Sequence, residues 1–214
     1  SISARVHRRQ SRMTRVCILL AVFLVTAIFG MADMELQSQR IQAIQQYGSW
    51  HAVIKDGISE SDSALIASRP ELVQTAWYGA KNTNLHADFS IGGRPVAVCG
   101  CDEAWLSMFP GVRWLEGGYP TQPDTISLTE NAQTLLGVGI GDTVTLDFPN
   151  GSATLRVTGL LHNTAMMNER DGVGLLFSLS DYRRYFSGIP DAAPWFYLEL
   201  SPLCNMQRTL AAIQ

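Results

Sequence analysis

An uncharged apolar run, residues 16–32, directly follows an arginine-rich start, and this pairing constrains the fold more than any other feature. The arginines of the first 15 residues are Arg5, Arg8, Arg9, Arg12 and Arg15. Leu, Ile, Phe and Val each favour the bilayer centre by roughly 0.3–0.6 kcal/mol, and they make up most of the run. Its length is near the lower limit for crossing a hydrocarbon core of about 30 Å. The sequence therefore predicts a transmembrane helix at 16–32.

The arginines also predict the orientation of this helix. Basic residues beside a membrane span are retained on the cytoplasmic side. We therefore expect residues 1–15 to be a basic cytoplasmic segment, and everything after Asp33 to lie outside the cell.

Two other interpretations of the apolar run stay open. A cleaved secretory signal also has a basic start, an apolar core and an exit of small residues, which Gly30 and Ala32 would supply. The second alternative is a buried core helix, although such helices seldom have a cluster of positive charges at one end only. The following residues favour a retained helix, because 33–46 are rich in helix formers. We predict a helical stalk there, with a packing stripe at coiled-coil-like spacing. The stripe residues are Met31, Met34, Ile41 and Ile44.

Charge is segregated along the chain. The full sequence has 16 basic and 19 acidic residues, and all five charges of the first 15 residues are positive. The rest of the chain is therefore acidic, which argues against nucleic acid as a partner. The roughly 165 residues that follow the stalk are enough to bury a core of their own.

The four cysteines do not form a disulfide framework. Cys17 lies in the apolar run and Cys204 near the end, while Cys99 and Cys101 are separated by one glycine. Residues i and i+2 of a strand lie about 7 Å apart, which is too far for an easy disulfide. A zinc site would also need a second pair of ligands. We expect small buried side chains at these two positions.

Apolar alternation, turn residues and capping residues predict short strands and helices after residue 47. The expected strands are 50–55, 72–78, 85–91, 94–101, 125–128, 144–148, 152–161, 173–177 and 195–200. The expected helices are 59–68, 103–109, 130–136, 181–186 and a last one that starts at Ser201 with Pro202. Residues 114–123 are expected to form a loop.

Local signals support these assignments. Gly92 with Gly93, and the stretch 149–151, mark hairpins. Ser59, Asp102 and Ser178 are typical N-caps, and Gly137 is a typical helix stop. Strands and short helices interleave without long crossovers, which favours an α+β fold with mixed or antiparallel sheets. We expect one outer domain over 47–214, as one body or two subdomains, incomplete at its C-terminus because the last helix is cut short.

No residue pattern predicts catalysis, a cofactor or a metal ion. There is no phosphate-binding loop of the G-x-x-x-x-G-K-[ST] type. The glycines of 137–141 superficially resemble a dinucleotide loop, but they follow a helix where that motif follows a strand. The four histidines lack zinc-ligand spacing.

Two further groups of polar residues contain side-chain types that catalysis uses. His86, Asp88 and Ser90 alternate on one predicted strand and are best interpreted as a solvated face, because a triad requires its members to meet head-on. The carboxylate pairs at 102–103 and 169/171 fit a helix cap and a loop.

Several aromatic residues either pack in the core or line a substrate path. They are Trp77, Tyr78, Trp105, Trp114, Tyr119, Trp195, Phe196 and Tyr197.

A basic start, one apolar helix, a helical extension and an outer α+β domain together resemble the permease subunits of the MacB/FtsX-like ABC transporter family. Four local patterns follow in the family's order, at 92–100, 116–120, 128–137 and 141–144. They are turns, caps and strand entries, so they indicate fold more than cargo. The resemblance covers nearly the whole chain but not the family's other three membrane helices or its cytoplasmic coupling loop. We therefore expect a fragment of a longer permease in a bacterial cytoplasmic membrane.

The resemblance implies a mechanical function without catalytic residues. A separate ABC ATPase subunit would move the membrane helices, and the stalk would pass this motion to the outer domain to export a peptide, lipid or drug. The stripe would pack on the returning stalk or on a second permease copy in a dimer, and the lipid bilayer would surround the membrane helix. Two alternatives stay open: a non-transporting regulator of cell-wall hydrolases or antibiotic sensing, and a secreted or anchored enzyme or binding module.

Overall fold

The computed structural model describes residues 2–55, 58–162 and 174–213, with side chains described from Met13 onward. The chain divides into two compact units, residues 1–43 and 44–214.

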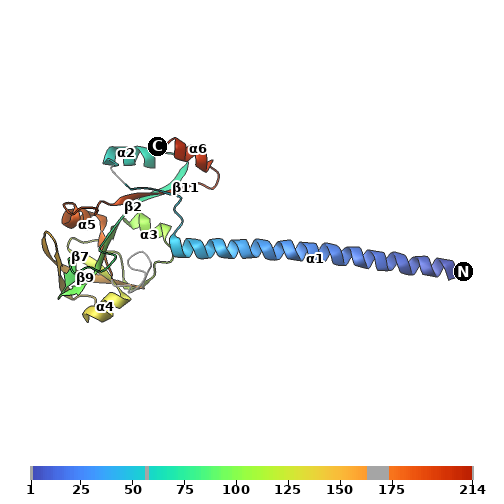
Figure 1. Cartoon of the computed structure of the whole chain (residues 1–214), viewed down its shortest axis with the longest axis horizontal. Helices are drawn as coiled ribbons and strands as arrows, with labels where there is room; N and C mark the ends of the chain where they lie inside the picture. Colours follow the sequence, from blue (N-terminus) through green and yellow to red (C-terminus); the bar gives the residue numbers. More distant parts are fainter. Residues whose placement is uncertain (1, 56–57, 163–173, 214) are drawn as a thin grey trace. The chain divides into compact units, whose positions relative to one another are not determined.

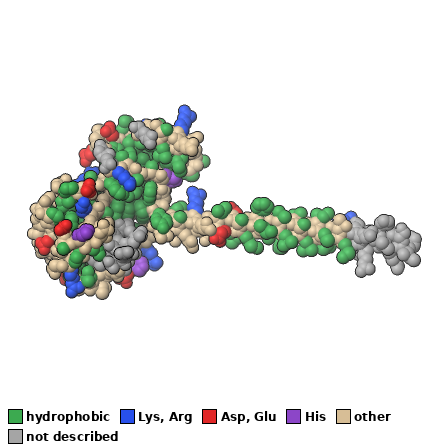
Figure 2. All heavy atoms as spheres, viewed as in Figure 1, with side chains coloured by type: hydrophobic (Ala, Val, Ile, Leu, Met, Phe, Trp, Pro, Cys, Tyr) green, Lys and Arg blue, Asp and Glu red, His purple; other side chains and the backbone are tan. Residues whose placement is uncertain are grey.

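One unbroken helix, α1 (Ile2–Tyr47), contains both the predicted membrane span and the predicted stalk. Large apolar side chains are exposed along it, with Phe23 at 68% and Phe29 at 72%, and Figure 2 shows them covering much of the visible helix surface. Consecutive apolar residues at 18–20 and 22–25 place them on every side of the helix, as in a membrane span. By length and composition, Met13–Tyr47 is the one described helix able to cross a membrane.

The part of α1 beyond residue 32 is largely polar and is supported by hydrogen bonds between successive turns. Gln37 Nε2 donates to Asp33 Oδ2 at 3.1 Å, and Gln39 Nε2 donates to Glu35 Oε1 at 3.0 Å. Side chains four residues apart are neighbours on a helix, and such pairs contribute a few tenths of a kcal/mol each.

The described residues of the second unit form an α+β domain around a mixed sheet (Figure 1). Its strands are β1 (Ala52–Ile54), β2 (Leu72–Lys81), β3 (Ser90–Ile91), β4 (Arg94–Pro95), β5 (Ala97–Cys101), β6 (Trp114–Gly117), β7 (Thr125–Thr129), β8 (Thr143–Phe148), β9 (Gly151–Leu161), β10 (Gly174–Ser178) and β11 (Trp195–Leu200). Its helices are α2 (Glu60–Ala67), α3 (Glu103–Met108), α4 (Glu130–Leu136), α5 (Leu179–Phe186) and α6 (Met206–Ala211).

The strand order is β1-β11-β2-β5-β10-β7-β9-β8-β3-β4, and β6 pairs with β9 outside this path. The pairs β5–β10 and β7–β9 are parallel, and the other pairs are antiparallel. Figure 1 shows α2 and α6 close together at one end of the domain. There Arg69, after α2, donates to the carbonyl of Ala212 at 2.7 Å.

Two apolar clusters fill the core. One lies around β7–β10 and α5 and includes Leu146, Phe177 and Phe186. The other lies between β2, β5 and α3 and includes Trp105 and Met108. The predicted α+β class is confirmed, since mixed strand pairs and short helices share these clusters.

Three local predictions were wrong. Residues 85–89 are not strand, because Asn82 holds a turn by bonding both the N–H and the carbonyl of His86. The polar set at positions 86, 88 and 90 is therefore not one strand face. Part of the predicted loop 114–123 is an edge strand, β6, paired with β9. The last helix begins after Asn205, whose side chain accepts the Arg208 N–H at 3.1 Å, and not at residue 201.

Candidate functional site

The predicted stripe of the stalk lies on α1. Met31, Met34 and Ile41 are exposed at 67%, 72% and 57%, and Ile44 is half-buried. At about 100° per residue, the four positions fall within about 140° of the helix circumference. Of the five predicted topology arginines, Arg15 is exposed. The side chains of the other four, at positions 5, 8, 9 and 12, lie outside the described part of the chain.

The last turn of α1 is in close contact with the turn that follows α3. Gly48 ends the helix with a φ of 87°, and its N–H donates to the Ile44 carbonyl at 2.8 Å. The Ser49 N–H then donates to the carbonyl of Met108 at 2.7 Å. A Cβ on Gly111 would lie 2.1 Å from the Gln45 carbonyl oxygen, so only glycine allows this approach. Residues 45–49 and 108–111 therefore form a tight junction, named here the stalk junction.

An aromatic stack connects the stalk junction to the sheet. Trp105 of α3 stacks on Phe109 with ring centroids 3.9 Å apart and on Tyr78 of β2 with centroids 4.2 Å apart. Trp105 is 1% exposed. Most of the aromatic residues considered above thus serve packing, as close ring pairs in a core do.

Asp102 fixes α3 against β2. Its carboxylate accepts the N–H of Trp105 at 3.0 Å, as an N-cap, and the N–H of Trp77 at 2.9 Å. Burial raises the pKa of this carboxyl group, while the two hydrogen bonds and the positive charge of Arg183 act in the opposite direction.

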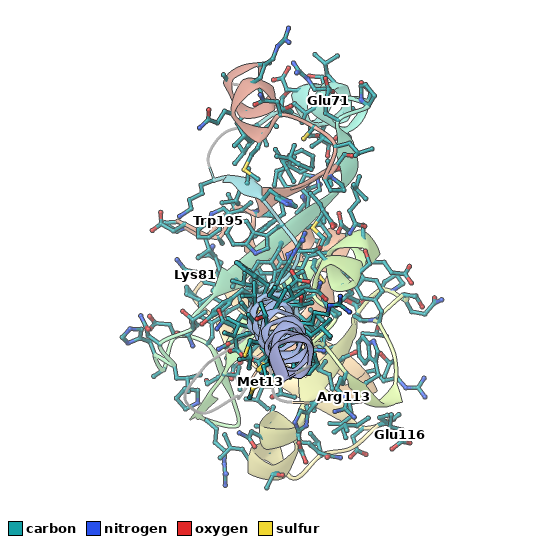
Figure 3. The ribbon with its side chains drawn as sticks, turned by 90° about the vertical axis from the view of Figure 1, so that its right-hand side faces the viewer. Met13, Glu71, Lys81, Arg113, Glu116 and Trp195 are labelled. Atoms are coloured by element: carbon teal, nitrogen blue, oxygen red, sulfur yellow. The ribbon has the colours of Figure 1, made fainter. Side chains whose placement is uncertain are left out.

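A pocket of about 270 Å³ lies where β1 ends and β11 begins. Its lining is Ile54, Lys55, Ile58, Glu60, Trp77, Arg183, Ala193 and Pro194. The Arg183 guanidinium lies 4.8 Å from the ring centre of Trp77, and Lys55 Nζ lies 4.6 Å from that of Trp195, which Figure 3 labels. Sequence reasoning singled out the two tryptophans but missed both cations, because nothing in the sequence indicates that residues 55 and 183 line the same pocket.

The cysteines follow the sequence-based interpretation. Cys99 and Cys101 are buried and form no disulfide among the described residues, and burial raises the pKa of the Cys99 thiol to about 12. Such a thiol is unreactive at neutral pH.

Within the described ranges, no three His, Cys, Asp or Glu side chains are grouped closely enough to hold a metal ion. The carboxylate pair at 169 and 171 lies outside the described residues.

A family model described as the MacB-like periplasmic core domain matches residues 12–214. The chain belongs to this family. Membership makes it a MacB-like domain of ABC transporter permease-type proteins, and the family implies an ATPase partner and a membrane context. No curated protein matches the chain.

Solved structures of low sequence identity share the fold of this MacB-like chain. The periplasmic region of MacB from Actinobacillus actinomycetemcomitans has a TM-score of 0.54 at 14% identity, covering 75% of this chain and 72% of that one. A domain of a putative permease protein from Porphyromonas gingivalis has a TM-score of 0.50 at 13% identity, covering 78% and 75%. A MacB-like domain that follows an apolar helix fits a membrane-anchored, extracytoplasmic location.

Proposed function

We propose that the chain is part of the permease subunit of a MacB/FtsX-type ABC transporter. In this proposal a separate ATPase subunit drives movement of the membrane helices. The stalk carries that movement to the extracytoplasmic domain, which exports a peptide, lipid or drug. The chain itself has no catalytic role.

The continuity of α1 supports this proposal most directly. The apolar run and the polar extension belong to one helix that ends at Tyr47. A helix keeps its backbone hydrogen bonds internal, so its end moves when the rest of it is displaced. The stalk junction holds that end against α3 by the Ser49–Met108 hydrogen bond and by the close approach of Gly111. In this proposal, displacement of the end of α1 is passed through the stalk junction to Trp105 and the sheet.

Cysteine labelling in intact cells tests the topology. Leu203 is 95% exposed, so Leu203→Cys in a Cys204→Ser background should react with a membrane-impermeant maleimide added outside. Ser11→Cys should react only after the cells are permeabilised, because the arginines hold that segment inside. The reverse pattern would contradict an extracytoplasmic domain.

The ATPase partnership is tested by co-purification. The tagged full-length protein, extracted in mild detergent, should retain an ATPase whose hydrolysis is sensitive to vanadate. A protein that purifies from native membranes with no such activity would contradict the permease function.

A further inference from the structure

The pocket at the junction of β1, β2, β11 and α5 has the chemistry of a peptide-end site. We propose that it binds the C-terminal carboxylate of an extended peptide whose last side chain is apolar. This inference deepens the proposed function by naming a ligand class, and it rests on that function only for the role of the ligand as cargo or regulator.

Two cations at the pocket lie over indole rings, and among the described residues the carboxylate within ion-pair distance of either is that of Glu60. The Asp102 carboxylate is close enough for its charge to interact with that of Arg183. Lys55 and Arg183 each lie over an indole, at 4.6 and 4.8 Å, which fixes their positions by cation–π attraction. No described carboxylate lies within ion-pair distance of Lys55. Arg183 contacts Glu60 at 3.4 Å, but the Glu60 side chain is 90% exposed. An exposed pair of this kind is weak, so an incoming anion can replace Glu60.

The shape of the pocket favours a chain end with an apolar side chain. Ile54, Ile58 and Pro194 supply apolar walls beside the two cations. The volume of about 270 Å³ is just below the usual range for drug-sized ligands, which suits one or two terminal residues. The planar guanidinium of Arg183 matches the two oxygens of a carboxylate.

The edge of the sheet favours a peptide over a lipid headgroup. β1 ends the strand order, and among the described strands it pairs only with β11. Its other edge can therefore hydrogen-bond an added strand, as in recognition by β-augmentation. Ile54, the last residue of β1, lines the pocket, so a peptide paired along β1 would bring its end to the cations.

Binding is measured by fluorescence polarisation with the full-length protein in detergent. The probe is a fluorescein-labelled hexapeptide that ends in leucine with a free carboxylate. Lys55→Gln and Arg183→Gln should each weaken binding about tenfold, whereas Glu60→Gln should strengthen it about two- to threefold by removing the competing carboxylate. Arg156→Gln is the matched control, because Arg156 is exposed on β9 and does not line the pocket. The same peptide with a C-terminal amide should bind about tenfold more weakly.

Several outcomes would overturn the proposal. Equal affinity for the acid and the amide would exclude carboxylate recognition. An equal loss of affinity in Arg156→Gln would indicate nonspecific charge attraction. Displacement of the probe by anionic phosphatidylglycerol vesicles but not by unlabelled peptide would assign the pocket to a lipid. The assay needs no ATPase, so failure of binding is distinguishable from failure of coupling.

Discussion

Tyr182 of α5 packs directly against two strand glycines, Gly79 and Gly100, which face each other across β2 and β5. A Cβ on Gly100 would lie 2.2 Å from the Cβ of Tyr182, which is fixed to the helix backbone and cannot swing aside. Gly100→Ala should therefore lower the free energy of unfolding by about 1–3 kcal/mol through overpacking. Urea denaturation of the purified protein measures this change.

The control for this glycine is Gly118→Ala, since nothing lies within 4 Å of a Cβ there. It should leave the unfolding midpoint nearly unchanged. Equal stability of the two variants would show that α5 can move away from the sheet without cost.

The surroundings of Asp124 predict that the free energy of unfolding depends on pH. Its carboxylate accepts hydrogen bonds from the Tyr185 hydroxyl and the Arg184 guanidinium. The hydrogen bond from Tyr185 makes the largest contribution, and together with Arg184 it lowers the pKa of this carboxyl group below its usual 3.8. A carboxyl group with a lowered folded-state pKa stabilises the fold above its unfolded pKa, and this contribution is lost as pH falls through the folded pKa. Stability should therefore fall on acidification below about pH 4.

Asp124→Asn should make this acid-side decline shallower, as followed by thermal unfolding between pH 3 and pH 6, since asparagine cannot ionise. Asparagine also tolerates the left-handed backbone at this position, where φ is 59°. Asp191→Asn is the control, because Asp191 has a φ of 56° and no ion pair among the described residues. Parallel curves for wild type and Asp124→Asn would contradict the assigned contribution.

At the level of elements, the geometry of the stalk junction predicts how a substitution there changes the opening of its backbone hydrogen bond. Gly111→Ala would place a methyl group 2.1 Å from the Gln45 carbonyl oxygen, so the turn after α3 has to move away. The Ser49–Met108 hydrogen bond should then open more often. Amide hydrogen exchange at Ser49 should become faster than in wild type, while exchange in β9 should not change. Unchanged exchange at Ser49 would show that the helix end and the turn adapt together.

The elements that sequence predicts correctly are those with local signals. Ser59, Asp102 and Ser178 are each N-caps whose side chains accept the N–H three residues on, and Gly137 ends α4 with a φ of 67°. β6 lacked such a signal, because an edge strand that contains Gly117 depends on pairing with β9. The α+β class followed from elements that carry their own caps and turns.

The candidate pocket, by contrast, depends on strand register. Ile54 pairs with Phe196, and Phe196 pairs with Trp77, so β1, β11 and β2 meet at one place although they are far apart in sequence. Arg183 joins them only because α5 packs over β2 and β5. Composition and spacing carry no information on such non-local pairings, so the sequence indicates the tryptophans as candidates but not the two cations.

For the molecule as a whole, the proposed lever makes the decisive prediction. Ile41 is 57% exposed on the predicted stripe, so Ile41→Asp should leave the outer domain folded and should keep the ATPase bound. A buried charge in a helix–helix contact is unfavourable, so the stripe should no longer pack on a partner helix. ATP hydrolysis by the co-purified complex, measured in nanodiscs, should then no longer be coupled to the permease and should differ from that of wild type. Ala43→Asp is the control, because Ala43 is exposed and two residues turn the helix by about 200°, which places the charge opposite Ile41. If both variants hydrolyse ATP as wild type does, α1 is an anchor and not a lever.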